Sequence, residues 1–142
     1  MIAAQDLMVG DWVSHFDEGK NCVVTELRGR KVAVSYTDDN GNTKYSVLLP
    51  EMAFEPIPIT AQILEKNGFI KSYGVSDTPP YDKDEEGNMY YSFKGEHKFW
   101  GWWQPDNTYY IPANAMGDIV VKYVHQLQHA MRLVGIKKTI EL

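Results

Sequence analysis

The stretch DIVVKYVHQLQHAMRLV, residues 118–134, predicts the longest helix of the chain. At 100° per residue its apolar side chains fall within one arc of about 120°, and the polar side chains fall on the opposite side. The arc contains Val120, Tyr123, Val124, Leu127, Ala130, Met131 and Val134. Asp118 suits the N-cap position, and Gly135 suits the left-handed position that ends a helix. We therefore expect a surface helix whose apolar stripe packs on a preceding sheet.

Two histidines, His125 and His129, stand four residues apart on the polar side of this predicted helix. Two histidines at this spacing are half of a zinc site. In the zinc-protease motif a Glu that acts as general base follows the first His, but here Gln126 has that place. The sequence offers no third ligand at a suitable spacing, and a catalytic zinc needs three. Two solvated histidines, with no metal and no cofactor, are the expectation; an enzyme that uses His125 or His129 is the alternative.

Composition predicts a folded, acidic protein. The 142 residues are 44% hydrophobic and 13% aromatic, which is enough for a packed core. The net charge is −5, and only residues 113–142, with two acids and four bases, are basic. A protein that binds duplex DNA is expected to carry a basic stripe. No such stripe is visible in the sequence, so duplex DNA is not an expected partner.

Cys22 is the one cysteine, so no disulfide can form within the chain, as is typical of a reducing compartment. It begins the apolar stretch CVVTEL, which favours a buried structural thiol over a nucleophile. The first residues, MIAAQDLMVGD, show no signal-peptide pattern. No apolar run approaches the roughly 18 residues of a membrane span. We expect a cytoplasmic protein without a membrane partner.

Residues 1–55 are predicted to form a small barrel. Strands are expected at 11–16, 21–28, 31–37 and 43–49, separated by turn residues such as Gly29-Arg30 and Asn40-Gly41. In the last of them Tyr45, Val47 and Leu49 would face inward. Short strands joined by tight turns within about 50 residues suggest an SH3-like barrel. This fold occurs in proteins of many functions, so it does not indicate one.

Residues 56–142 are predicted to form an α+β sub-domain. Glu55-Pro56-Ile57-Pro58 is expected to be an extended linker, because each Pro disfavours helix at the residue before it. Thr60 would cap a short helix over 61–66, and Asn67-Gly68 would end that helix. A strand at 69–73 and a solvated acidic loop at 74–87 follow. The predicted fold class is thus α+β, an SH3-like barrel followed by an antiparallel sheet covered by two helices.

Residues 88–111 contain nine of the chain's 18 aromatic residues. Three antiparallel strands are expected, at 89–94, 98–104 and 107–111. Strand alternation sorts their residues into two faces. The core face would contain Met89, Tyr91, Phe93, Phe99, Trp103, Tyr109 and Ile111. The second face would contain Tyr90, Ser92, Lys94, Lys98, Trp100, Trp102, Gln104, Thr108 and Tyr110.

The second face supplies the candidate binding residues Tyr90, Trp100, Trp102 and Tyr110. An exposed platform of Tyr and Trp stacks sugars or unpaired bases, or forms a protein interface. Packing of the same face on the N-terminal barrel is the alternative, because large exposed aromatic patches are rare in monomers. The choice between binding and packing stays open at the level of sequence.

Three stretches resemble a family of small proteins encoded in Bacteroidetes genomes, some of them near phage or mobile-element genes. They are Asp6–Val13 (DLMVGDWV), Glu55–Thr60 (EPIPIT) with the following helix and Asn67-Gly68-Phe69, and Tyr123–Gln128 (YVHQLQ). The resemblance covers both ends and the middle of the chain. It implies a shared fold and a shared place for His125 and Gln128, and it implies no chemistry.

The sequence therefore predicts a non-enzymatic binding or protein-interaction module with no catalytic residues, and the resemblance suggests an accessory protein of a phage or mobile element. A protein partner or self-association is the leading expectation. Single-stranded nucleic acid or a glycan, bound through the aromatic face, is the alternative.

Overall fold

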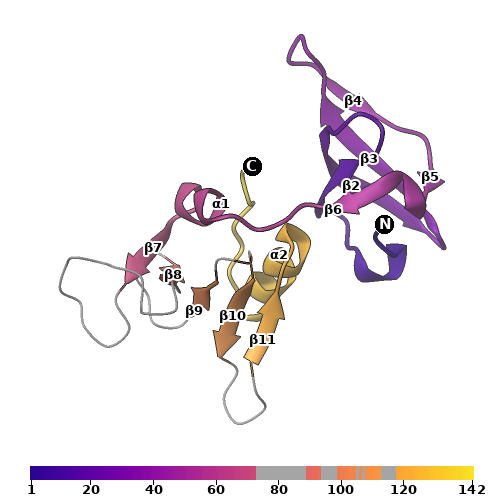
Figure 1. Cartoon of the computed structure of the whole chain (residues 1–142). Helices are drawn as coiled ribbons and strands as arrows, with labels where there is room; N and C mark the ends of the chain where they lie inside the picture. The colour runs from indigo at the N-terminus through magenta and orange to yellow at the C-terminus, as the bar shows by residue number, and fades with distance from the viewer. Residues whose placement is uncertain (73–88, 94–98, 105, 107, 113–117) are drawn as a thin grey trace. The chain divides into compact units, whose positions relative to one another are not determined.

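The computed structural model describes residues 1–72, 89–93, 99–104, 106, 108–112 and 118–142. The chain forms two compact units, Met1–Ile57 and Pro58–Leu142 (Figure 1). Each unit is built on an antiparallel sheet, and the second also contains two α-helices. The protein therefore belongs to the α+β class. The loop expected at 74–87 lies outside the described residues.

The N-terminal unit is a six-stranded sheet with two short 3-10 helices. Its elements are η1 (Ala4–Asp6), β1 (Trp12–His15), β2 (Asn21–Arg28), β3 (Lys31–Thr37), β4 (Thr43–Tyr45), β5 (Leu49–Pro50), η2 (Glu51–Ala53) and β6 (Phe54–Pro56). The strands run in the order β4-β3-β2-β1-β6, and β5 also pairs with β3. Among the described strands none joins β4 to β6, so the sheet is open at both edges.

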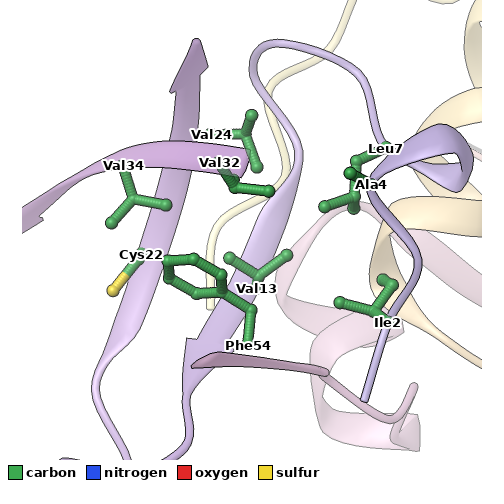
Figure 2. Packing of buried hydrophobic residues seen from close by; sticks show 9 residues of the cluster. All are labelled: Ile2, Ala4, Leu7, Val13, Cys22, Val24, Val32, Val34 and Phe54. Carbon is green, nitrogen blue, oxygen red and sulfur yellow. The ribbon is translucent and has the colours of Figure 1, made fainter. Parts of the chain in front are cut away.

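The core of this unit combines strand residues with residues from the first few positions of the chain. The cluster contains Ile2, Ala4, Leu7, Val13, Cys22, Val24, Val32, Val34 and Phe54 (Figure 2). The Phe54 ring lies beside Cys22 and Val13 (Figure 2). The Cys22 thiol is buried as expected, and burial raises its pKa. A buried thiol held in its protonated form is a packing group and a poor nucleophile.

The strand predicted at 43–49 is interrupted, because β4 ends at Tyr45 and β5 begins at Leu49. Ser46 ends the pairing. Its N–H donates to the Val34 carbonyl at 2.8 Å, and its hydroxyl oxygen, in place of a backbone carbonyl, accepts from the Val34 N–H at 2.9 Å. Tyr45 and Val47 are 72% and 76% exposed, so the prediction that they face inward is wrong.

The linker predicted at 55–58 begins as a strand. Phe54 is fully buried, and β6 pairs with β1 through Ser14–Glu55 and Val13–Pro56. A strand at the edge of a sheet tolerates Pro56, because the missing N–H costs no bond on the outer side. The prediction of a linker is therefore wrong for residues 55 and 56.

Glu51 connects three parts of the N-terminal unit. Its carboxylate accepts a hydrogen bond from the Ala4 N–H at 2.7 Å and another from Arg30 Nε at 2.6 Å. The Ala4 N–H and then the Arg30 guanidinium lower the pKa of Glu51 below its ordinary value of 4.5. A carboxyl group whose pKa is lower in the folded state stabilises that state above its unfolded pKa. This stabilisation is lost as the pH falls through the folded pKa.

Glu51→Gln is therefore expected to lower the urea midpoint of the N-terminal unit at pH 7, and to change it much less at pH 3. The cause is the loss of a charge-assisted acceptor that exists only when Glu51 is ionised. Urea melts of both proteins at the two pH values measure this. Glu26→Gln is the control, because Glu26 pairs at 2.7 Å with Arg28 on an exposed surface. An equal loss for Glu51→Gln at both pH values would contradict the expectation.

The C-terminal unit is a five-stranded sheet with two α-helices. Its elements are α1 (Ala61–Lys66), β7 (Phe69–Ser72), β8 (Met89–Phe93), β9 (Trp100–Trp103), β10 (Tyr109–Pro112), β11 (Asp118–Val121) and α2 (Val124–Leu133). The strands follow their sequence order, β11-β10-β9-β8-β7. Thr60 caps α1 as predicted, because its hydroxyl oxygen accepts from the Ile63 N–H at 3.2 Å. The side chain of Tyr91 in β8 joins the sheet to α1 by donating to Glu65 at 3.1 Å.

The helix predicted at 118–134 is only partly a helix. Asp118–Val121 forms β11 and pairs with β10, with Ile119 opposite Ile111 and Val121 opposite Tyr109. The β-branched run Ile119–Val121 suits a strand, and β10 offers it a free edge. The helix α2 then begins at Val124, where the Gln126 side chain accepts from the Tyr123 N–H at 3.3 Å. Gln126, at the general-base position of the zinc-protease motif, is thus a capping residue.

The buried side of α2 is wider than the predicted stripe. Val124, Leu127, Ala130 and Met131 are buried as expected, and so are His125 and Gln128. The predicted solvent exposure of His125 is wrong, since this residue is 3% exposed. The Tyr123 ring stacks on its imidazole, with ring centroids 5.9 Å apart and an interplanar angle of 9°.

Hydrogen bonds close the C-terminal ends of both helices. Gly135, with φ of +81°, follows α2, and its N–H donates to the Arg132 carbonyl while the Ile136 N–H donates to the Met131 carbonyl. This pair of bonds is the Schellman motif. At the end of α1 the fully buried Asn67 exchanges two hydrogen bonds of 2.7 Å with the backbone of Glu141. The amide of Asn67 therefore pairs with the C-terminal segment as a neighbouring strand would.

Candidate functional site

The strand register brings three of the four candidate binding residues into one line. Tyr90 on β8 lies opposite Trp102 on β9, and Trp102 lies opposite Tyr110 on β10. The line continues to Ser72 on β7 and to Val120 on β11. We call these five residues the central row. It crosses all five strands of the sheet, and paired residues in such a row share one face.

A second line of paired residues runs beside the central row. Ile70 on β7 lies opposite Ser92 on β8, which lies opposite Trp100 on β9. Since successive residues of a strand alternate between faces, positions 100 and 102 belong to the same face. We call Ile70, Ser92 and Trp100 the second row. The two rows together place all four predicted residues on one face.

The opposite face is the core of the unit. Tyr91, Phe93, Phe99, Tyr109 and Ile111 are all buried, which agrees with the faces sorted from the sequence. Trp103 is half-buried. Three aromatic rings cluster around Phe69, at centroid distances of 5.4 Å to Phe93, 6.0 Å to Phe99 and 6.1 Å to Tyr109. The two rows therefore lie on a sheet that is firmly packed from behind.

Hydrogen bonds between strands also brace the sheet from the core side. The hydroxyl of Tyr109 donates to the Tyr91 carbonyl at 2.9 Å. Burial raises the pKa of Tyr109, and burial together with the Glu65 carboxylate raises the pKa of Tyr91. Both phenols stay protonated at neutral pH, so both remain hydrogen-bond donors. Gly101, between Trp100 and Trp102, lies against the backbone of β10 on this side.

Two exposed apolar residues lie on the edge strands of the face that contains the two rows. Ile70 is 51% exposed and Val120 is 48% exposed. Tyr110 is half-buried, and the small residue Ser92 is buried. The side chains of Tyr90, Trp100 and Trp102 lie outside the described part of the chain. The sequence did not identify Ile70 and Val120 as part of this face. Val120 was missed because it lay within the helix predicted at 118–134.

The paired histidines of α2 lie close together in the structure. Their rings meet edge to face at 5.9 Å, with His125 buried and His129 half-buried. Within the described residues no group of three or more His, Cys, Asp or Glu side chains is placed to hold a metal ion. The arrangement Tyr123–His125–His129 is an aromatic stack that packs the start of the helix.

Comparison with known proteins adds no relative: no family model, curated protein or solved structure matches the chain. In the part of the chain that the structure describes, no helix is both long and apolar enough to cross a membrane.

Proposed function

We propose that the chain is a non-enzymatic binding module that binds a protein partner through the central and second rows of the C-terminal sheet. The observation that carries the proposal is the register, which lines up Tyr90, Trp102 and Tyr110 across three neighbouring strands. Tyr and Trp residues in a line across a sheet offer a large contact area at little entropic cost. Tyr and Trp are the residues most enriched in protein interfaces and their hot spots.

The composition of the two rows favours a protein over the other ligands. Neither row contains a charged residue, whereas a nucleic-acid surface needs Lys or Arg for the phosphates. The exposed aliphatic residues Ile70 and Val120 offer nothing to the hydroxyl groups of a sugar. The two rows have an aromatic centre and no charge, as is typical of the middle of a protein interface, and Lys94 and Lys98, which the sequence assigns to the same face, suit its polar rim.

The test uses a photo-crosslinking amino acid at Tyr110 and, as a control, at the exposed Leu133 on α2. We expect one defined polypeptide to be captured from position 110 and not from position 133. Trp102→Ala should then weaken binding of that purified polypeptide at least tenfold, about 1.4 kcal/mol, without changing the urea midpoint.

Two further ligands in the same assay decide against the proposal if they bind. Cellohexaose and a fifteen-residue oligo(dT) represent the glycan and the unpaired bases. Saturable binding of either one, lost in Trp102→Ala, would replace the protein partner with that ligand. Loss of folding in Trp102→Ala would mean that the face is buried, and the binding role would be wrong.

We also propose that the N-terminal unit is an SH3-like domain. A meander of antiparallel strands followed by a 3-10 helix, η2, and a last strand that returns to β1 supports this classification. The resemblance of three stretches to proteins of Bacteroidetes phages and mobile elements supports a role as an accessory protein of such an element. The buried single cysteine supports a cytoplasmic location.

A further inference from the structure

The strand β4 forms an edge of the N-terminal sheet and pairs on one side only. Its three residues lie opposite β3, with Ser35–Tyr45, Tyr36–Lys44 and Thr37–Thr43 as partners. The described residues supply no strand on its other side (Figure 1). An edge of this kind presents backbone groups to which another strand can bond.

The hydrogen bonds at both ends of β4 identify the backbone groups that point outward. The Asp38 N–H donates to the Asn42 carbonyl, and the Ser46 N–H donates to the Val34 carbonyl, each at 2.8 Å. In an antiparallel pair the bonded positions recur every two residues. Lys44 is therefore the bonded position toward β3. It follows that Thr43 and Tyr45 direct their N–H and carbonyl groups away from the sheet.

The edge at β4 is preformed, because hydrogen bonds hold the chain on both sides of it. At one end Asp38 Oδ1 accepts from the N–H groups of Asn40 at 3.0 Å and Asn42 at 2.8 Å. At the other end the Ser46 hydroxyl accepts from the Val34 N–H at 2.9 Å. An edge already held straight binds a strand without first losing its own conformational entropy. The opposite edge, β6, ends in Pro56, which lacks an N–H to offer.

Both faces beside this edge offer side-chain contacts to a bound strand. Tyr45 and Val47 are large, apolar and more than 70% exposed. On the other face, next to the Tyr36–Lys44 pair, lies a cavity of about 120 Å³ whose lining includes Tyr36, Ser46 and Leu49. When a strand is added to a sheet edge, backbone hydrogen bonds provide the affinity. Contacts with every second side chain of the added strand provide the specificity.

The net charge of the N-terminal unit favours a different protein over a second copy of the chain as the strand that binds at β4. Residues 1–57 contain nine Asp or Glu and five Lys or Arg, a net charge of −4. Two such units brought edge to edge would repel each other, whereas a basic segment would be attracted. We propose that β4 accepts an extended, basic segment of a partner protein as an additional strand. This site lies in the N-terminal unit and is independent of the aromatic rows.

The test begins with a library of linear ten-residue peptides displayed on phage and selected on the full chain. We expect the selected peptides to be basic, with β-branched residues at alternate positions. A synthetic copy of the best peptide should slow amide hydrogen exchange at Thr43 and Tyr45 at least tenfold. The amides of Ile70 and Val120, in the C-terminal sheet, should keep their rates.

Two variants of one residue separate backbone pairing from side-chain contact. Tyr45→Pro removes the outward N–H and should weaken peptide binding at least tenfold. Tyr45→Ser keeps that N–H and should weaken binding less. Because the Tyr45 N–H makes no bond to β3, the urea midpoint should stay near that of the parent chain in both.

Three outcomes would overturn the proposal. The first is a selection that yields no peptide, and the second is a peptide that binds without slowing exchange at Thr43 and Tyr45. The third is a dimer of the chain alone in sedimentation that Tyr45→Pro dissociates, since the occupant would then be a second copy. Trp102→Ala should leave peptide binding unchanged, so failure here and failure of the aromatic rows are distinguishable.

Discussion

Gly101→Ala is expected to lower the free energy of unfolding of the C-terminal unit by about 3 kcal/mol or more. A β-carbon at this position would collide with the backbone carbonyl of Tyr110 and lie 2.9 Å from Cζ of Tyr109. Neither neighbour can withdraw easily, because one is backbone of the adjacent strand and the other is a fully buried ring. Overpacking of a rigid core costs about 1–3 kcal/mol, and more where backbone has to move.

Urea melts followed by tryptophan fluorescence measure this effect, because Trp100, Trp102 and Trp103 all lie in the C-terminal unit. The control is Gly135→Ala, where a β-carbon meets nothing within 4 Å and the strain comes only from a φ of +81°. That strain costs about 1–2 kcal/mol. If Gly101→Ala were no more destabilising than Gly135→Ala, β9 and β10 would not approach as closely as described. The register that pairs Trp102 with Tyr110 would then also be wrong.

Leu127→Ala is expected to destabilise the same unit by about 2–5 kcal/mol, the usual cost of a cavity left by a buried leucine. Leu127 is fully buried and lies in the middle of α2. The matched control on this helix is Leu133→Ala, because Leu133 is 82% exposed. The control should cost less than about 0.5 kcal/mol. Equal losses of unfolding free energy for the two variants would show that the assignment of the buried side of α2 is wrong.

Local chemistry was enough to predict several elements from the sequence. The bounds of β2 and β3 agree with the predicted strands, because Gly29 and the Asp38–Gly41 turn confine them on both sides. The start of α1 follows from Thr60, whose side chain bonds the first turn whatever the rest of the chain does. In each case the deciding interactions lie within a few residues of one another.

Other elements depended on partners outside their own segment of the chain. The run Ile119–Val121 is apolar and fits either a helix or a strand, and the free edge of β10 decided for a strand. Likewise the sequence predicts a linker at Glu55-Pro56, and pairing with β1 makes these residues part of a strand. Tyr45 and Val47 are exposed because Ser46 bonds to Val34, twelve residues earlier.

For the candidate site, the sequence by itself determined which residues share a face. Alternation along each strand grouped Tyr90, Trp102 and Tyr110, because successive side chains of a strand point to opposite sides. Only the tertiary structure decided that these residues stand opposite one another, and that Ser72 and Val120 extend their row. The reason is that alternation is a property of one strand, whereas register is set by the hydrogen bonds that each strand makes with its neighbours in the sheet.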